Sequence, residues 1–225
     1  MIIKIEKLSL TEKFIEQIRL KIPDFEIQVR KDGIYASRQT NNIDNVIYFE
    51  KGKATNGELN LSIWVNVNYP YLQKIASSIN SNLKNKSTLP YRLRHLYKVL
   101  NLNSQLFESD QVIKREVLPI KESNIEKYIT RFIGEYESII SKHFQKFKDI
   151  NGLIEWYNYL IDIESNREFR SLWRDPYNHL IALKLSNRNI EKTQSEWENQ
   201  IEENEKILYK EVTREIRSLT LDMMP

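Results

Sequence analysis

The chain has 225 residues, of which 40% are hydrophobic and 29% are charged, and its formal net charge at pH 7 is +3. This composition supplies the apolar mass for one large domain or two small ones, and it excludes an intrinsically disordered chain. The chain has no cysteine, which excludes disulfides, thiolate metal sites and cysteine nucleophiles.

The first 70 residues predict one helix followed by a meander of strands. The helix begins after a cap at Ser9 or Thr11 and ends at Pro23, because an apolar residue recurs at every fourth position between them. A tight turn at 31–33 contains an Asp-Gly pair, which is suited to positive φ. The strands are expected at 25–30, 34–38, 46–50 and 59–67, with a polar turn at 39–44.

The strand at 59–67 has the clearest alternation in the chain. Slipping this strand by one residue would expose its whole aliphatic set, so one face must be buried. We predict that its core-facing residues are Leu61, Ile63, Val65 and Val67, with Ser62, Trp64 and Asn66 on the opposite face.

A second helix is predicted to begin at Pro70, with Leu72, Ile75, Ala76 and Ile79 facing inward. The polar residues 77–88 are typical of a loop. The segments 90–100 and 112–118 are ambiguous, and we favour two further strands.

After Ile120 the apolar period changes to 3.6, which is typical of helices. Ser123 and Glu126 predict a capping box for the first of them, and its broad stripe reaches Phe144. Further helices are expected at 150–163, from Asp175-Pro176 onward, and as one long final helix from about 190 to 219.

Strands thus dominate the first half and helices the second, an order that favours the α+β class over an alternating parallel sheet. We predict one domain over residues 1–225, with a sheet-rich part at 1–120 and a helical part at 121–225. Its sheet is mainly antiparallel, with about four to six strands, and helices mostly from the C-terminal half pack against it.

The sequence lacks the residue patterns of several common cofactor, metal and catalytic sites. The five glycines form no phosphate-binding loop, and His95, His143 and His179 have no second histidine at helical spacing. We expect the histidines to be surface or partly buried residues, and we expect no metal and no cofactor. Asp44 and Glu50 flank a strand, but their spacing is not the acidic-x-lysine arrangement of metal nucleases. We therefore expect a protein that is not an enzyme.

Membrane and secretion signals are also missing. No apolar run reaches the roughly 18–20 residues that span a bilayer, and the first residues do not form a signal peptide. We expect a cytoplasmic protein without a membrane partner. The abundance of Asn, Lys and Ile is typical of an AT-rich bacterial genome.

The distribution of charge is uneven. Between Glu58 and Glu108 the chain has no acidic residue and a local charge of +6, so the remainder sums to −3. This asymmetry indicates a surface for an anionic partner, although a solvated cationic face needs no partner. Guanidinium groups beside aromatic rings suit a protein interface or nucleic acid. The candidate partner-binding residues are Tyr91, Arg92, Arg94, Tyr97 and Lys98.

The arrangement resembles a broad group of small bacterial α+β proteins, some of them immunity proteins of polymorphic toxin systems. The resemblance rests on a leading helix, on strands reading GIYASR, NVIYFEKG and LNLSIWVNVNY, and on a helical C-terminal half. It covers residues 10 to 70 and includes no catalytic signature, so no functional residue is carried over. Many immunity proteins are acidic because they cover cationic toxins, whereas this chain is mildly basic.

The resemblance implies non-catalytic protein binding of the kind that an immunity or accessory protein performs, by steric occlusion. The alternative is nucleic-acid binding through the basic segment 84–98. The sequence leaves the oligomeric state and the packing of the final helix open.

Overall fold

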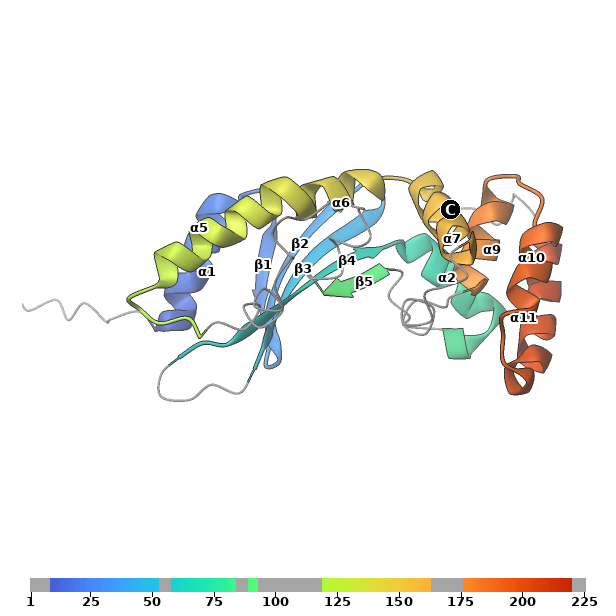
Figure 1. Cartoon of the computed structure of the whole chain (residues 1–225), viewed down its shortest axis with the longest axis horizontal. Helices are drawn as coiled ribbons and strands as arrows, with labels where there is room; N and C mark the ends of the chain where they lie inside the picture. Colours follow the sequence, from blue (N-terminus) through green and yellow to red (C-terminus); the bar gives the residue numbers. More distant parts are fainter. Residues whose placement is uncertain (1–8, 53–57, 84–88, 93–118, 163–175, 220–225) are drawn as a thin grey trace, which may run out of the picture. The chain divides into compact units, whose positions relative to one another are not determined.

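The computed structural model describes residues 9–52, 58–83, 89–92, 119–162 and 176–219 (Figure 1). Its mainly antiparallel sheet comes from the N-terminal half and most of its helices come from the C-terminal half, so the α+β prediction is confirmed. No helix of the described part is both long and apolar enough to cross a membrane.

The chain divides into two compact units, and each draws on both halves of the sequence. The sheet unit comprises Met1–Gln39, Asp44–Asn66 and Pro90–Gln145, and the helical unit comprises Thr40–Ile43, Val67–Leu89 and Lys146–Pro225. A boundary at residue 120 therefore does not separate the units, and a single domain over 1–225 stays a prediction.

The sheet has the strand order β1-β2-β3-β4-β5, so each strand lies beside its neighbour in the sequence. The strands are β1 (Glu26–Val29), β2 (Gly33–Thr40), β3 (Ile43–Lys51), β4 (Leu61–Asn68) and β5 (Leu89–Arg92). The alternation predicted for β4 is confirmed, since Leu61, Ile63, Val65 and Val67 are all buried.

Two tight turns build the meander, and only one of them uses positive φ. Asn41 (φ 52°) and Asn42 (φ 60°) connect β2 to β3, a shorter turn than the predicted 39–44. Gly33 does not have the positive φ that its Asp-Gly pair suggests. Glycine is required there for close approach, because a Cβ would lie 2.4 Å from the carbonyl oxygen of Phe49.

Helices α1 (Leu10–Lys21) and α5 (Ile125–Glu135) cover one face of the sheet (Figure 1). The ring of Phe49 on β3 lies between them, with its centroid 5.3 Å from that of Phe14 and 5.2 Å from that of Phe132. Ser9 caps α1 as predicted, and it forms a reciprocal capping box with Glu12.

The capping box predicted at Ser123 is wrong. The N-cap of α5 is Asn124, whose side chain caps no helical amide. Its Oδ1 instead accepts a hydrogen bond from the Lys121 amide at 2.7 Å, and its Nδ2 donates to the Pro119 carbonyl at 3.2 Å. The preceding turn thus uses the side chain that would otherwise cap the helix.

The predicted apolar stripe continues through the π-helical segment η3 (Tyr136–Ile140) into α6 (Ser141–Lys146). Ile140 and Phe144 are buried as predicted, but Ile139 is buried as well. The wider π turn changes the angular position of successive residues, so two neighbouring isoleucines both reach the core.

The helical unit is built around α9 (Pro176–Leu185). Its other helices are α2 (Pro70–Ile79), α7 (Ile150–Asp162), α10 (Glu191–Glu198) and α11 (Lys206–Ser218), with short 3₁₀ turns η1 (Ser81–Leu83) and η4 (Glu203–Glu205). Helix α9 contacts α2, α7, α10 and α11. Every residue from Pro176 to Leu183 is therefore buried.

Two histidines differ from their prediction as surface or partly buried residues, because His143 and His179 are both fully buried. His179 lies on α9 and is enclosed by aromatic rings. It stacks on Tyr157 with centroids 5.1 Å apart, and its Nδ1 accepts a hydrogen bond from Trp197 Nε1 at 3.0 Å. His95 lies outside the described residues.

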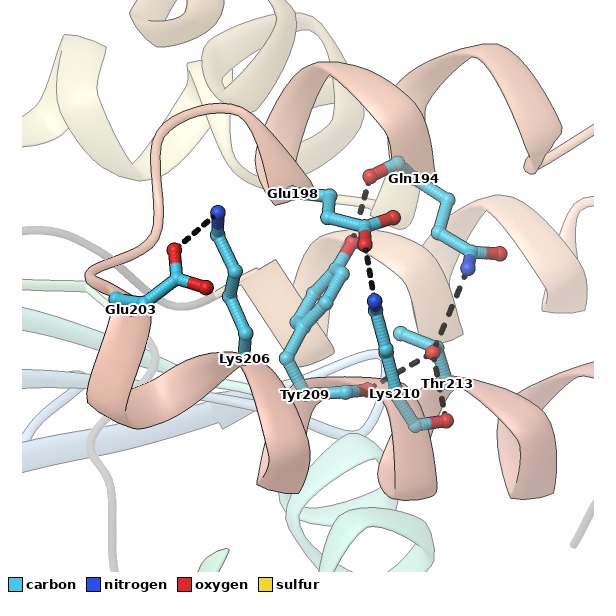
Figure 2. A network of polar contacts seen from close by, with 7 residues as sticks. All are labelled: Gln194, Glu198, Glu203, Lys206, Tyr209, Lys210 and Thr213. Carbon is cyan, nitrogen blue, oxygen red and sulfur yellow. Dashed lines mark hydrogen bonds and ion pairs between the residues drawn. The ribbon is translucent and has the colours of Figure 1, made fainter.

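The single long final helix predicted at 190–219 is wrong, since the chain forms two helices, α10 and α11, with residues 199–205 between them. Figure 2 shows the polar contacts that join them: Tyr209 Oη donates to the Gln194 carbonyl at 2.9 Å, and Lys210 Nζ lies 3.1 Å from Glu198 Oε1. The reversal buries Trp197 and Tyr209 together in the helical unit, whereas Leu208 is 37% exposed.

Replacing Gly152 with alanine should destabilise the helical unit. Asp149 Oδ1 accepts hydrogen bonds from the amides of Asn151 and Gly152 and so caps α7. A Cβ at Gly152 would lie 1.9 Å from the carbonyl oxygen of Lys146. We expect a loss of about 1–3 kcal/mol in the free energy of unfolding, measured by urea denaturation.

The matched control is Gly134→Ala in the exposed part of α5, where a Cβ would meet no atom within 4 Å. Alanine should raise stability there by about 0.5–1 kcal/mol through helix propensity. Equal effects at the two glycines would contradict the close contact at Gly152.

Candidate binding face of the sheet

The sequence-predicted partner-binding residues belong to β5 and the segment after it. Tyr91 and Arg92 are the last two residues of β5, but the structure does not describe their side chains. Arg94, Tyr97 and Lys98 fall within 93–118, which is also outside it. This site stays a prediction.

A second candidate is the outer face of the sheet, which we define as the strand face opposite α1 and α5. The described side chains on this face are half-buried or exposed, because no described helix of the sheet unit packs on them. They are Glu26, Gln28, Arg30, Tyr35, Ser37, Gln39, Asp44, Val46, Tyr48, Glu50, Ser62, Trp64 and Asn66, together with Asp32 from the β1–β2 turn.

The centre of the outer face is an aromatic pair held by one carboxylate. The rings of Tyr35 and Tyr48 stack with centroids 4.3 Å apart and planes 14° apart. Both hydroxyls donate to Asp32 Oδ2, at 2.7 Å and 3.2 Å, and the Arg30 guanidinium lies 4.3 Å from the centroid of the Tyr35 ring. These contacts connect the β1–β2 turn to β2 and β3 and hold the two rings in place, so the aromatic surface is preorganised for binding.

Polar contacts extend from this centre toward β4. Trp64 Nε1 donates to Glu50 Oε2 at 2.9 Å, and Gln39 Nε2 donates to Asp44 Oδ1 at 3.1 Å. The two carboxylates therefore serve different partners. The described residues contain no group of His, Asp and Glu side chains that would hold a metal ion.

The ionisation states in the centre suit binding better than proton transfer. The hydrogen bond from Tyr35 lowers the pKa of Asp32, so this carboxyl is anionic at neutral pH. Burial and then the hydrogen bond to Asp32 raise the pKa of Tyr35. Burial and then the interaction with Tyr35 raise the pKa of Tyr48. Tyrosines with raised pKa values remain protonated and are poor nucleophiles or bases.

The described side chains of the outer face are mostly acidic, although the whole chain is basic. Its described carboxylates are Glu26, Asp32, Asp44 and Glu50, and its one described cation is Arg30, which gives −4 + 1 = −3. A phosphate backbone would be repelled by such a surface, whereas a cationic partner would be attracted to it.

Sequence reasoning placed Trp64 on this face but did not identify Tyr35, Tyr48 or Asp32 as candidates. A signal was present, since Tyr35 and Tyr48 occupy the polar positions of two successive alternating strands. Their stacking depends on the register between β2 and β3, which alternation within one strand does not specify.

Comparison of the chain with protein-family models, with curated proteins and with solved structures returned no match.

Proposed function

We propose that this protein binds another protein without catalysis and that the outer face of its sheet carries the contact. The observation that carries the proposal is the preorganised centre, in which Tyr35 and Tyr48 stack and both donate to Asp32. Tyrosine, tryptophan and arginine supply most of the energy at protein interfaces. Stacking and hydrogen bonds that already hold these side chains reduce the entropy lost on binding.

The charge of the face indicates the kind of partner. With a described charge of −3, the outer face complements a cationic protein surface and would accelerate its association. Occlusion of a cationic surface is the action expected of an immunity or accessory protein, the class that the sequence resembles.

Nucleic-acid binding is the second candidate function. It is favoured by the local charge of +6 between Glu58 and Glu108, and it would use the basic segment 84–98. The two candidates place the contact on different residues, so one set of variants separates them.

A binding experiment with one outer-face variant tests the proposal. Immobilised protein is exposed to nuclease-treated lysate of the source cells, and the affinity of any captured protein is then measured for wild type and for Trp64→Ala. We expect Trp64→Ala to lose at least about 2 kcal/mol, or about 30-fold in Kd, because a large aromatic side chain of the outer face is removed.

Glu16→Ala is the control, because Glu16 is exposed on α1, away from the outer face. It should bind as tightly as wild type. Equal affinity of the Trp64→Ala variant would contradict the proposed face. Capture of RNA or DNA in place of protein, from lysate without nuclease and with steep weakening by salt, would favour the second candidate.

A further inference from the structure

Among the strands that the structure describes, β1 forms one edge of the sheet, since it stands first in the strand order. Edge strands present unpaired backbone groups and are usually protected by a proline, a bulge, an inward-pointing charge or a covering segment. Residues 26–29 contain no proline. Glu26, Gln28 and Val29 are exposed, and Val29 is 52% exposed although it is aliphatic.

The alternating hydrogen-bond pattern between β1 and β2 identifies which backbone groups of β1 point away from the sheet. The Arg30 amide donates to the Gly33 carbonyl at 2.8 Å, and the Gly33 amide donates to the Arg30 carbonyl at 3.3 Å, so Arg30 and Gly33 are a hydrogen-bonded pair. Such pairs alternate along an antiparallel ladder, and Gln28 pairs with Tyr35. Gln28 and Arg30 therefore bond toward β2, while the amides and carbonyls of Ile27 and Val29 point to the free edge.

The side chains of β1 are self-complementary about Gln28. In an antiparallel pair of two such strands centred there, Ile27 lies opposite Val29 and can exchange both backbone hydrogen bonds with it. Glu26 then lies opposite Arg30 in a non-hydrogen-bonded pair, where side chains are closest. Both side chains are exposed, and each has a hydrogen bond with Gln28: Gln28 Nε2 donates to Glu26 Oε1 at 3.0 Å, and Arg30 Nη2 donates to Gln28 Oε1 at 3.2 Å. Neither Glu26 nor Arg30 forms an ion pair with a described residue, so their charges can pair with those of another strand.

We propose that β1 binds β1 of a second copy of this chain, antiparallel and with a two-fold axis at Gln28. The pairing uses both free-edge residues of each strand and forms two equivalent Glu26–Arg30 ion pairs. It also covers the exposed Val29 side chain. Shifting the register by one residue would place Ile27 and Val29 opposite residues whose backbone groups bond to β2, so the hydrogen bonds between the two copies would be lost. The sequence EIQVR centred at Gln28 therefore suits an isologous arrangement.

A second copy is favoured over a foreign strand because the complementarity is internal to the five residues 26–30. A foreign strand would need its own arginine and glutamate at matching positions. The contact uses the β1 border of the outer face, whereas Tyr48 and Trp64 lie on β3 and β4, so variants of β1 and the Trp64→Ala variant test different residues.

A charge-exchange experiment tests the dimer by sedimentation velocity of the full chain, from low to high micromolar concentration. Wild type should shift from monomer to dimer as the concentration rises. Glu26→Arg alone places like charges opposite each other twice per dimer, as does Arg30→Glu alone, so each should weaken dimerisation at least about tenfold. An equal mixture of the two variants should form heterodimers with affinity close to that of wild type.

Val29→Pro provides a second variant, because it removes an amide that points to the free edge and is not needed by β2. It should abolish the dimer while leaving the circular dichroism spectrum unchanged. In hydrogen exchange, the Ile27 and Val29 amides should gain protection as wild type becomes more concentrated. A monomer at every concentration, a dimer that withstands Val29→Pro, or a mixture that stays monomeric would overturn the proposal.

Discussion

Val65→Asp should unfold the sheet unit or leave the protein insoluble. Val65 is fully buried at the centre of β4, on the face that α1 and α5 cover. A carboxylate there has no solvent and no described cationic partner, and burying an unpaired charge is among the few changes that cost more than about 4–5 kcal/mol. Because a domain of this size has only about 5–15 kcal/mol of total stability, the folded state should be lost.

The measurement is thermal denaturation followed by circular dichroism, together with the soluble yield. The matched control is Ser62→Asp on the same strand, because Ser62 is half-buried on the outer face, where a carboxylate can reach water. Ser62→Asp should remain folded with a change within about 1 kcal/mol. A melting temperature of Val65→Asp equal to that of wild type would show that β4 buries its other face.

The helical unit should lose stability as the pH falls below neutral, through His179. Burial lowers the pKa of this imidazole from 6.5 to about 3. The geometry gives the same direction, since Nδ1 accepts a hydrogen bond from Trp197 Nε1 and a protonated ring would set one N–H against another. Between these two pKa values the unfolded chain binds a proton that the folded chain does not.

The stability contributed by neutral His179 is therefore complete above pH 6.5 and is lost progressively toward pH 3. Relative to pH 7, we expect a loss of about 2 kcal/mol at pH 5, because each pH unit below 6.5 costs about 1.4 kcal/mol. Urea denaturation at a series of pH values measures this slope.

His179→Asn is the control, because its side-chain oxygen can still accept the Trp197 hydrogen bond but it does not titrate. This variant should be less stable at pH 7 and should show a shallower pH dependence between pH 7 and pH 5. A slope identical to that of wild type would assign the acid sensitivity to other groups.

The spacing of apolar residues correctly predicted those helices and strands that pack one face against the core. The strict alternation of β4 and the spacing-four stripe of α1 each correspond to a buried face in the structure. The Ser9 cap was also predictable, because capping depends on neighbours three residues away. The cap predicted at Ser123 failed although its residues fit, because Asn124 bonds to Lys121 and Pro119 and shifts the start of the helix.

The same spacing did not predict burial or helix ends where contacts between residues distant in the sequence determine them. Helix α9 shows one apolar side in the sequence, yet the four helices around it also bury Asn178 and His179. The final helical segment has a continuous period of 3.6 but reverses direction at 199–205, because Trp197 and Tyr209 are then buried in one core. Helix propensity contributes too little per residue to resist such burial.

Of the two candidate sites, one was found from the sequence and the other only from the structure. The charge asymmetry around residues 84–98 is a property of the sequence alone, and it remains the basis of the nucleic-acid alternative. The outer face required the tertiary structure, because the stacking of Tyr35 on Tyr48 and their shared bond to Asp32 depend on strand register.

The sequence by itself determined the α+β class and the buried face of each amphipathic element, because these follow from apolar periods within short segments. Only the tertiary structure decided which described strand became an edge of the sheet, which of its backbone groups point away from the sheet, and which histidines lost contact with water. Each of these depends on residues distant in the chain, whose packing energy exceeds any local preference.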